Sequence, residues 1–154
     1  MRLGMSFFLA IVVALAPLGA GAAGIRETRP NLVYGELGGR AVLLSAGYER
    51  YLTDRVGIGI GAFGFGNSEG GVALIPVYLS FIPVGDTHSL YLSGGATYLG
   101  GGSWDENWGT WFGTASAGYQ YQSEGGFFIR PLMTMVYRTD GFVVFPGVTM
   151  GGSF

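Results

Sequence analysis

The chain has 154 residues, of which 49% are hydrophobic and only 12% charged, with 30 glycines and a formal net charge of −2 at pH 7. An ordinary soluble domain carries about 25% charged residues, so these charges are too few to cover the surface of a soluble globule. The acidic balance gives no support to a nucleic-acid surface, and the absence of cysteine excludes disulfides and thiolate metal sites.

The first 23 residues have the pattern of a cleaved secretory signal peptide. Arg2 supplies a positive charge, residues 7–18 form a short apolar core, and small residues at 20–22 are typical of a processing site. The apolar core is too short for a membrane-spanning helix. We therefore expect a signal peptide at 1–23 and a single mature domain at 24–154.

The mature chain is divided by seven clusters of turn residues into eight segments that alternate apolar with small or polar side chains. This alternation over about ten residues is typical of a transmembrane β-barrel, in which one face meets lipid and the other faces a lumen. The predicted strands are 31–36, 40–51, 56–66, 71–82, 88–100, 110–122, 126–138 and 142–154. An even strand number places the second, fourth and sixth turns on the periplasmic side and the other turns outside.

Outward-phase aromatic residues gather at both ends of the predicted strands, as expected for the two interfaces of a membrane. The periplasmic belt contains Tyr48, Phe81, Tyr119, Tyr121, Phe127 and Phe154. The outer belt contains Tyr98, Trp111, Tyr137 and Phe142. A soluble β-sandwich, in which these aromatics would be core residues, remains the alternative.

Three prolines fall inside predicted strands, at positions 76, 131 and 146. A closed barrel has no free edge at which a missing amide is harmless. Each proline must therefore mark a bulge or a locally broken pairing. If the prolines ended strands instead, a soluble Greek-key sandwich would be favoured.

Ionisable side chains fall on the inward phase. Glu36, Glu49 and Arg130 share this phase with Tyr34 and Tyr78. A buried charge is costly unless it is paired, so we predict a carboxylate–arginine cluster in which Arg130 is held by Glu49, or by Glu36 if the strand stagger brings that residue nearer. An eight-stranded barrel is narrow enough for such side chains to fill, which predicts a plugged lumen. A role as an acid/base pair or proton path stays open.

The longest predicted exposed turn, residues 101–109, combines Trp104 and Trp108 with Asp105 and Glu106. Exposed loops carry function in many barrels, so these four residues are candidates for binding a ligand or partner. Tryptophan at the rim of a membrane protein also anchors the interface. Two carboxylates alone are too few for a calcium site, and we expect no bound metal.

Two motif matches carry little weight. Residues 59–64 satisfy GxGxxG, but they lie in a predicted strand with no helix after them to receive a pyrophosphate. Asp86, His88 and Ser89 include the residue types of a hydrolytic triad but crowd one turn, where they could hardly align in series. We expect no catalytic residues and no cofactor.

Residues 36–39, 46–54, 118–121 and 125–131, together with the terminal Phe154, resemble the hairpins and last strands of small bacterial outer-membrane β-barrel proteins. The resemblance covers nearly all of the mature chain, and its motifs are structural. It implies an eight-stranded barrel inserted by the outer-membrane assembly machinery, with Phe154 as part of the assembly signal. It implies no established activity.

We therefore expect an all-β, eight-stranded antiparallel up-and-down transmembrane barrel, monomeric in the bacterial outer membrane and surrounded by its lipids. Its expected role is structural or binding. One alternative is an outer-membrane lipid-modifying enzyme, similar to a lipid A deacylase, which needs a His and Ser pair aligned on the lipid face. His88 and Ser89 are adjacent and would point to opposite faces of a strand. Another is a soluble periplasmic lipocalin-like carrier, which needs a polar exterior.

Overall fold

The computed structural model describes residues 24–103, 107–139 and 141–154. Their elements in chain order are α2 (Ile25–Thr28), β1 (Asn31–Gly38), the 3-10 helix η1 (Gly39–Ala41), β2 (Leu44–Tyr51), β3 (Val56–Asn67), β4 (Gly70–Phe81), β5 (His88–Ser103), β6 (Asn107–Gln122), β7 (Phe127–Arg138) and β8 (Gly141–Ser153). The predicted signal peptide at 1–23 lies outside the described residues. No described helix has the length and apolar character needed to cross a membrane.

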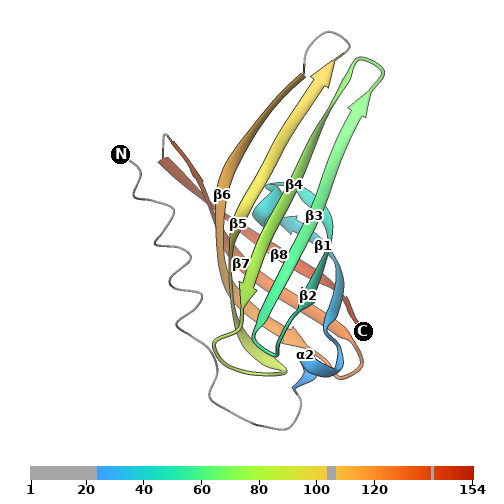
Figure 1. Cartoon of the computed structure of the whole chain (residues 1–154), viewed down its shortest axis with the longest axis vertical. Helices are drawn as coiled ribbons and strands as arrows, with labels where there is room; N and C mark the ends of the chain where they lie inside the picture. Colours follow the sequence, from blue (N-terminus) through green and yellow to red (C-terminus); the bar gives the residue numbers. More distant parts are fainter. Residues whose placement is uncertain (1–23, 104–106, 140) are drawn as a thin grey trace.

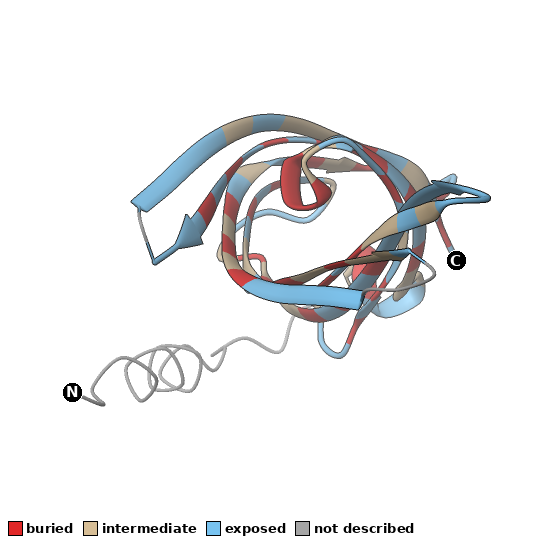
Figure 2. Ribbon diagram, turned by 90° about the horizontal axis from the view of Figure 1, so that it is seen from above, coloured by how far each residue is buried: buried red, intermediate tan, exposed pale blue. Residues whose placement is uncertain are grey.

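The eight strands close into one barrel in which every strand is antiparallel to both neighbours (Figure 1). Closure is made by β1 and β8, whose pairing runs from Leu32 opposite Ser153 to Gly38 opposite Gly147. Viewed from above, the strands form a ring (Figure 2). The predicted fold class is therefore confirmed.

Side chains alternate between the interior and the outside along each strand, as the two-residue period of an extended chain requires. In β7, Arg130 and Thr134 are buried and polar, whereas Met133 and Met135 are exposed and apolar. The other strands repeat this arrangement, with many large apolar side chains exposed. A soluble monomer rarely exposes so much apolar surface.

The β3–β4 and β5–β6 hairpins rise beyond the other strands at one end of the barrel (Figure 1). The predicted turn at 101–109 is wrong in its extent, because the ladder between β5 and β6 continues to Gly102 opposite Asn107. Gly101 permits this pairing, since a Cβ there would collide with the ring of Trp108. The glycine-rich segment is extended strand because its glycines make room for the aromatic neighbour.

The predicted strand at 40–51 is wrong in its first residues, because β2 begins only at Leu44. Gly38 and Gly39 both have positive φ, 71° and 69°, and Val42 has φ 68°. These dihedral angles break the extended chain and form η1, whose three residues are all buried. The first hairpin therefore sends a short helix into the barrel interior.

Pro76, Pro131 and Pro146 do not end strands, because β4, β7 and β8 run through them. The β3–β4 pairing is interrupted beside Pro76 and resumes in the same register, and the β6–β7 pairing behaves in the same way beside Pro131. Pro146 pairs with β7, and its other side lies just beyond the end of the β1–β8 ladder at Gly147. The prolines therefore mark locally broken pairing and not bulges.

Candidate functional site: the buried charge network

Glu49 on β2 and Arg130 on β7 form an ion pair across the barrel interior. Arg130 Nη1 lies 2.8 Å from Glu49 Oε2, and both side chains are 0% exposed. Glu49 also accepts hydrogen bonds from Ser80 Oγ at 2.5 Å and from the Tyr78 hydroxyl at 3.1 Å. Both carboxylate oxygens thus have donors, which a buried charge requires.

The Arg130 side chain makes further contacts besides the ion pair with Glu49. Its Nε donates to Gln120 Oε1 at 2.9 Å, and its Cζ lies 3.7 Å from the centre of the Tyr91 ring. A ring face carries partial negative charge and attracts a cation. These contacts fix the arginine in one position.

A second ion pair joins Glu36 on β1 to Arg40 on η1. Arg40 Nη1 lies 2.5 Å from Glu36 Oε2, and the Arg40 backbone N–H donates to Glu36 Oε1 at 2.8 Å. Thr149 donates a further hydrogen bond to Glu36 Oε2 at 2.9 Å. The carboxylate therefore holds η1 through both its main chain and its side chain.

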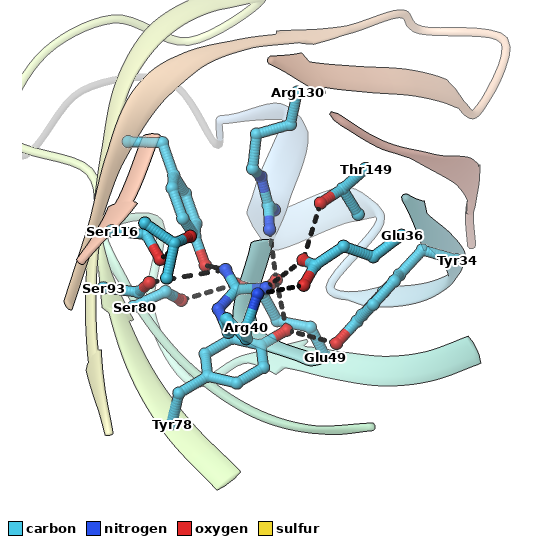
Figure 3. Close-up of polar contacts among 12 residues, drawn as sticks. Tyr34, Glu36, Arg40, Glu49, Tyr78, Ser80, Ser93, Ser116, Arg130 and Thr149 are labelled. Atoms are coloured by element: carbon cyan, nitrogen blue, oxygen red, sulfur yellow. Dashed lines mark hydrogen bonds and ion pairs between the residues drawn. The ribbon is translucent and has the colours of Figure 1, made fainter. Parts of the chain in front are cut away.

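Tyrosines join the two ion pairs into one network (Figure 3). Arg40 Nη2 donates to the Tyr91 hydroxyl at 2.6 Å, and Arg40 Cζ lies 3.9 Å from the centre of the Tyr78 ring. The Tyr78 hydroxyl donates a hydrogen bond to Glu49. The Tyr34 hydroxyl lies 2.8 Å from the Tyr78 hydroxyl and therefore donates to it. Each arginine thus contacts a tyrosine that also contacts the other pair.

Glycines provide the space for these rings. A Cβ on Gly59 would collide with the Tyr78 ring, and a Cβ on Gly47 would collide with the Tyr34 ring. The sequence places Gly57, Gly59 and Gly61 on the inward phase of β3, and Gly59 lies directly opposite Tyr78 of β4. The glycines of β2 and β3 therefore provide the space that the two interior tyrosine rings occupy.

A third buried arginine, Arg26, belongs to α2, which lies at one end of the barrel (Figure 1). Its side chain is 2% exposed and donates to the carbonyl oxygens of Gly85 and Asp86 at 3.3 and 2.6 Å. It also contacts Ser89 Oγ, and its Cζ lies 5.6 Å from the centre of the Tyr51 ring. The α2 segment is thereby fixed to the β4–β5 turn.

The structure brings together Glu36, Glu49, Arg130 and Tyr78, the residues that the strand phase assigned to an interior cluster. Arg130 contacts Glu49, and Glu36 is occupied by Arg40. Sequence reasoning missed Arg40 because it placed residue 40 at the start of a strand. The signal available was the second inward carboxylate, which needed a cation of its own.

Of the four residues predicted as a binding site in the turn at 101–109, the structure describes only Trp108. Trp104, Asp105 and Glu106 lie outside the described residues. Trp108 is half-exposed and belongs to β6, on the same phase as the buried Phe112. Its ring packs beside Gly101, as described above, so Trp108 lies on the inner face of the wall and not on the outward phase of the aromatic belts.

His88 and Ser89 lie on opposite sides of β5. His88 is exposed and its Nδ1 contacts the Tyr119 hydroxyl, whereas Ser89 is buried and donates to the Asp86 carbonyl at 2.7 Å. Asp86 Oδ1 accepts the Ile25 backbone N–H at 3.0 Å. The geometry therefore forms no Ser-His-Asp relay. Among the described residues, no group of three or more histidine or carboxylate side chains could hold a metal ion.

The last residue closes the ladder between the two ends of the described chain. The Phe154 backbone N–H donates to the Asn31 carbonyl at 2.9 Å, and the Asn31 N–H donates to the Phe154 carbonyl at 3.0 Å. The Phe154 side chain is exposed on the outside of the barrel. The terminal aromatic is thus available to the surroundings while its backbone is paired.

Comparison with solved structures identifies the fold of this barrel. The N-terminal β-barrel domain of Pseudomonas aeruginosa OprF matches with a TM-score of 0.60 and 17% identity, over 80% of this chain and 95% of that one. The fold is that of a small outer-membrane β-barrel. Ail, the attachment invasion locus protein of Yersinia pestis, matches with a TM-score of 0.44 and 16% identity, over 81% of this chain and 94% of that one. No protein-family model and no curated protein sequence matches the chain.

Proposed function

We propose that the protein is a bacterial outer-membrane barrel with a structural or binding role, a closed lumen and no catalytic cycle. Its outward face supports this proposal, because the exposed side chains of the strands are mainly large and apolar. Exposed aromatics stand at both ends of the strands, with Tyr119 and Phe127 at one end and Trp111 and Tyr137 at the other. Two such belts are expected where a barrel crosses the two interfaces of a membrane.

The proposed orientation follows from strand parity. The α2 segment and the turns after β2, β4 and β6 face the periplasm, and the long β3–β4 and β5–β6 hairpins face outside. Bacterial barrels have short periplasmic turns and longer extracellular segments. The proposed surroundings are outer-membrane lipids, the proposed route of insertion is the outer-membrane assembly machinery, and the proposed state is a monomer.

The proposal of a closed lumen rests on two buried ion pairs, Glu49–Arg130 and Glu36–Arg40. The carboxylates, guanidiniums and hydroxyls of this network bind one another. The helix η1, which carries Arg40, lies in the barrel interior, and α2 packs at one end of the barrel. An ion crossing the barrel would have to break contacts between paired buried charges. Such contacts are costly to break because each partner would be left without compensation.

Conductance across planar lipid bilayers tests this proposal. We expect the purified protein to insert into the bilayer without producing conductance steps as large as those of a porin. The matched comparison is Glu36→Gln with Arg40→Gln, which removes the η1 ion pair and should raise the frequency of small openings. Stable porin-like steps from the parent protein would show that the lumen is open and would refute the closed barrel.

A lipid-modifying enzyme finds no support in the described geometry. The candidate residues His88 and Ser89 face opposite sides, and Ser89 is engaged with Arg26. A soluble ligand carrier is disfavoured by the exposed apolar outer face. The structural or binding role is therefore the better-supported proposal.

A further inference from the structure

A groove of about 710 Å³ crosses the outer surface of the barrel from β2 to β5. Its side walls are apolar, with Tyr48 at the β2 end and Ile58, Ile60, Val77 and Leu79 along its length. At the β5 end it is floored by small residues, Gly94, Gly95 and Ala96. Small residues beside large ones leave a hollow in the apolar outer surface.

The wall at the β2 end is held in place. The Tyr48 hydroxyl donates to Asn31 Oδ1 at 2.6 Å, and Asn31 Nδ2 donates to the Phe154 carbonyl at 3.1 Å. Tyr48 is therefore fixed by the strand that closes the barrel. A preformed wall lowers the cost of ordering a ligand against it.

A single charge lies beside this end of the groove. Arg50 is exposed and follows the buried Glu49, so it shares the outward phase with Tyr48. It pairs with Ile58 across β2 and β3, which brings its Cβ close to that of a groove residue. Within the described strands, Arg50 is the one Asp, Glu, Lys or Arg on the outward phase.

Arg50 also lacks a protein counter-ion in the part of the chain that the structure describes, since the ion pairs found there involve Arg26, Arg40, Arg55 and Arg130. A cation on the lipid face of a barrel is unfavourable in proportion to its depth. An anionic group from the membrane would satisfy it, and a planar guanidinium binds phosphate with two parallel hydrogen bonds.

We propose that the groove and Arg50 form a binding site for one net-anionic phospholipid of the periplasmic leaflet. The headgroup phosphate binds the Arg50 guanidinium at the level of the periplasmic aromatic belt, and one acyl chain lies in the groove over Gly94 and Ala96. This inference rests on the proposed membrane location and orientation. It adds a lipid class and a defined site to the general contact with outer-membrane lipids.

The test uses the purified mature protein folded in detergent micelles, with equal amounts of phosphatidylglycerol and phosphatidylethanolamine, and native mass spectrometry to count retained lipids. We expect one retained lipid, with phosphatidylglycerol favoured about tenfold, because the ammonium of phosphatidylethanolamine repels the guanidinium and competes with it for the phosphate. Arg50→Gln should abolish the preference. Arg138→Gln, which removes an exposed arginine at the other end of the barrel, should leave it intact.

A second pair of variants tests the groove. Ala96→Leu fills the floor and should reduce retention of both lipids several-fold, whereas Ala117→Leu, at an exposed position on β6 outside the groove, should have no effect. Slower migration of the boiled than of the unboiled protein verifies that each variant is folded.

Three results would overturn the proposal. The first is an unchanged headgroup preference in Arg50→Gln, and the second is unchanged retention in Ala96→Leu. The third is a protein dimer that Ala96→Leu dissociates, which would assign the groove to a second copy of the chain. Because the experiment is performed in micelles, a failure here leaves the conductance and location tests of the proposed function unaffected.

Discussion

Arg130 is the residue on which the interior network depends most. It contacts a carboxylate, an amide and an aromatic face, and it is completely buried. Loss of one partner from a buried pair leaves the other charge without compensation, whereas an exposed pair contributes little. The exposed ion pair of Arg55 with Asp54, at 3.5 Å, is an example of the second kind.

Arg130→Met should therefore lower the free energy of unfolding by about 3–5 kcal/mol, measured by urea denaturation in phospholipid vesicles. Replacing Glu49 by Gln in the same chain should restore part of the loss, because the orphaned charge is removed. Glu36→Gln should not rescue Arg130→Met, since Glu36 pairs with Arg40.

The control is Arg138→Met, an exposed position on the same strand, for which we expect a change within about 0.5 kcal/mol. Unfolding of Arg130→Met at the same urea concentration as the parent would mean that Arg130 is not buried against a carboxylate. The phase of β7 would then be wrong by one residue.

At the scale of elements, η1 is the part of the fold that local sequence patterns predict least well. It depends on Gly38 and Gly39 at positive φ, and a Cβ on Gly38 would collide with the Pro146 carbonyl of β8. The turn is thus determined by backbone conformation on β1 and by a close approach from the neighbouring strand. Its result is the placement of Arg40 inside the barrel.

Gly38→Ala should destabilise the barrel by at least about 1–2 kcal/mol, because a left-handed conformation disfavours any Cβ and the added carbon also meets backbone. Urea unfolding measures the change. The matched control is Gly125→Ala in the β6–β7 turn, where a Cβ would have its nearest contact at 3.8 Å and φ is not positive. Equal stability of the two variants would contradict the described conformation of the first hairpin.

The strands and their inward residues could be predicted from the sequence because the two-residue period is a local property. Glu36, Glu49 and Arg130 follow directly from that period. Arg40 could not be predicted in this way, since its position depends on a turn in which even Val42 takes a positive φ, against the preference of a β-branched residue.

The position of Arg26 also depends on tertiary structure. Its partners are mainly backbone carbonyls of turns distant in sequence, which no local pattern identifies. The long β5–β6 hairpin was underestimated for a different reason. A glycine-rich sequence usually indicates a turn, but here the glycines accommodate the rings of neighbouring strands.

At the scale of the whole molecule, the outer face of the barrel is apolar while buried charges are confined to the interior. Ion pairs and polar side chains share the interior with two clusters of buried apolar residues, and large apolar residues cover the outside. Such a surface needs a second apolar phase around it. The proposed outer-membrane location satisfies this requirement and gives the two long hairpins an extracellular position.

Cysteine labelling tests the orientation. The chain has no cysteine, so Asn107→Cys introduces a single thiol at the outer end of β6, where the side chain is exposed. A membrane-impermeant maleimide should label it on intact cells. Thr53→Cys, in the exposed turn after β2, is the control and should react only after the outer membrane is broken. The reverse result would invert the topology.

The central claim is that the folded barrel resides in a membrane, and fractionation of cells followed by electrophoresis of boiled and unboiled samples tests it most directly. We expect the mature protein in the outer-membrane fraction after a carbonate wash, with the unboiled form migrating faster because a closed barrel stays compact in dodecyl sulfate. Recovery of the mature protein in the soluble periplasmic fraction without detergent would contradict the membrane barrel.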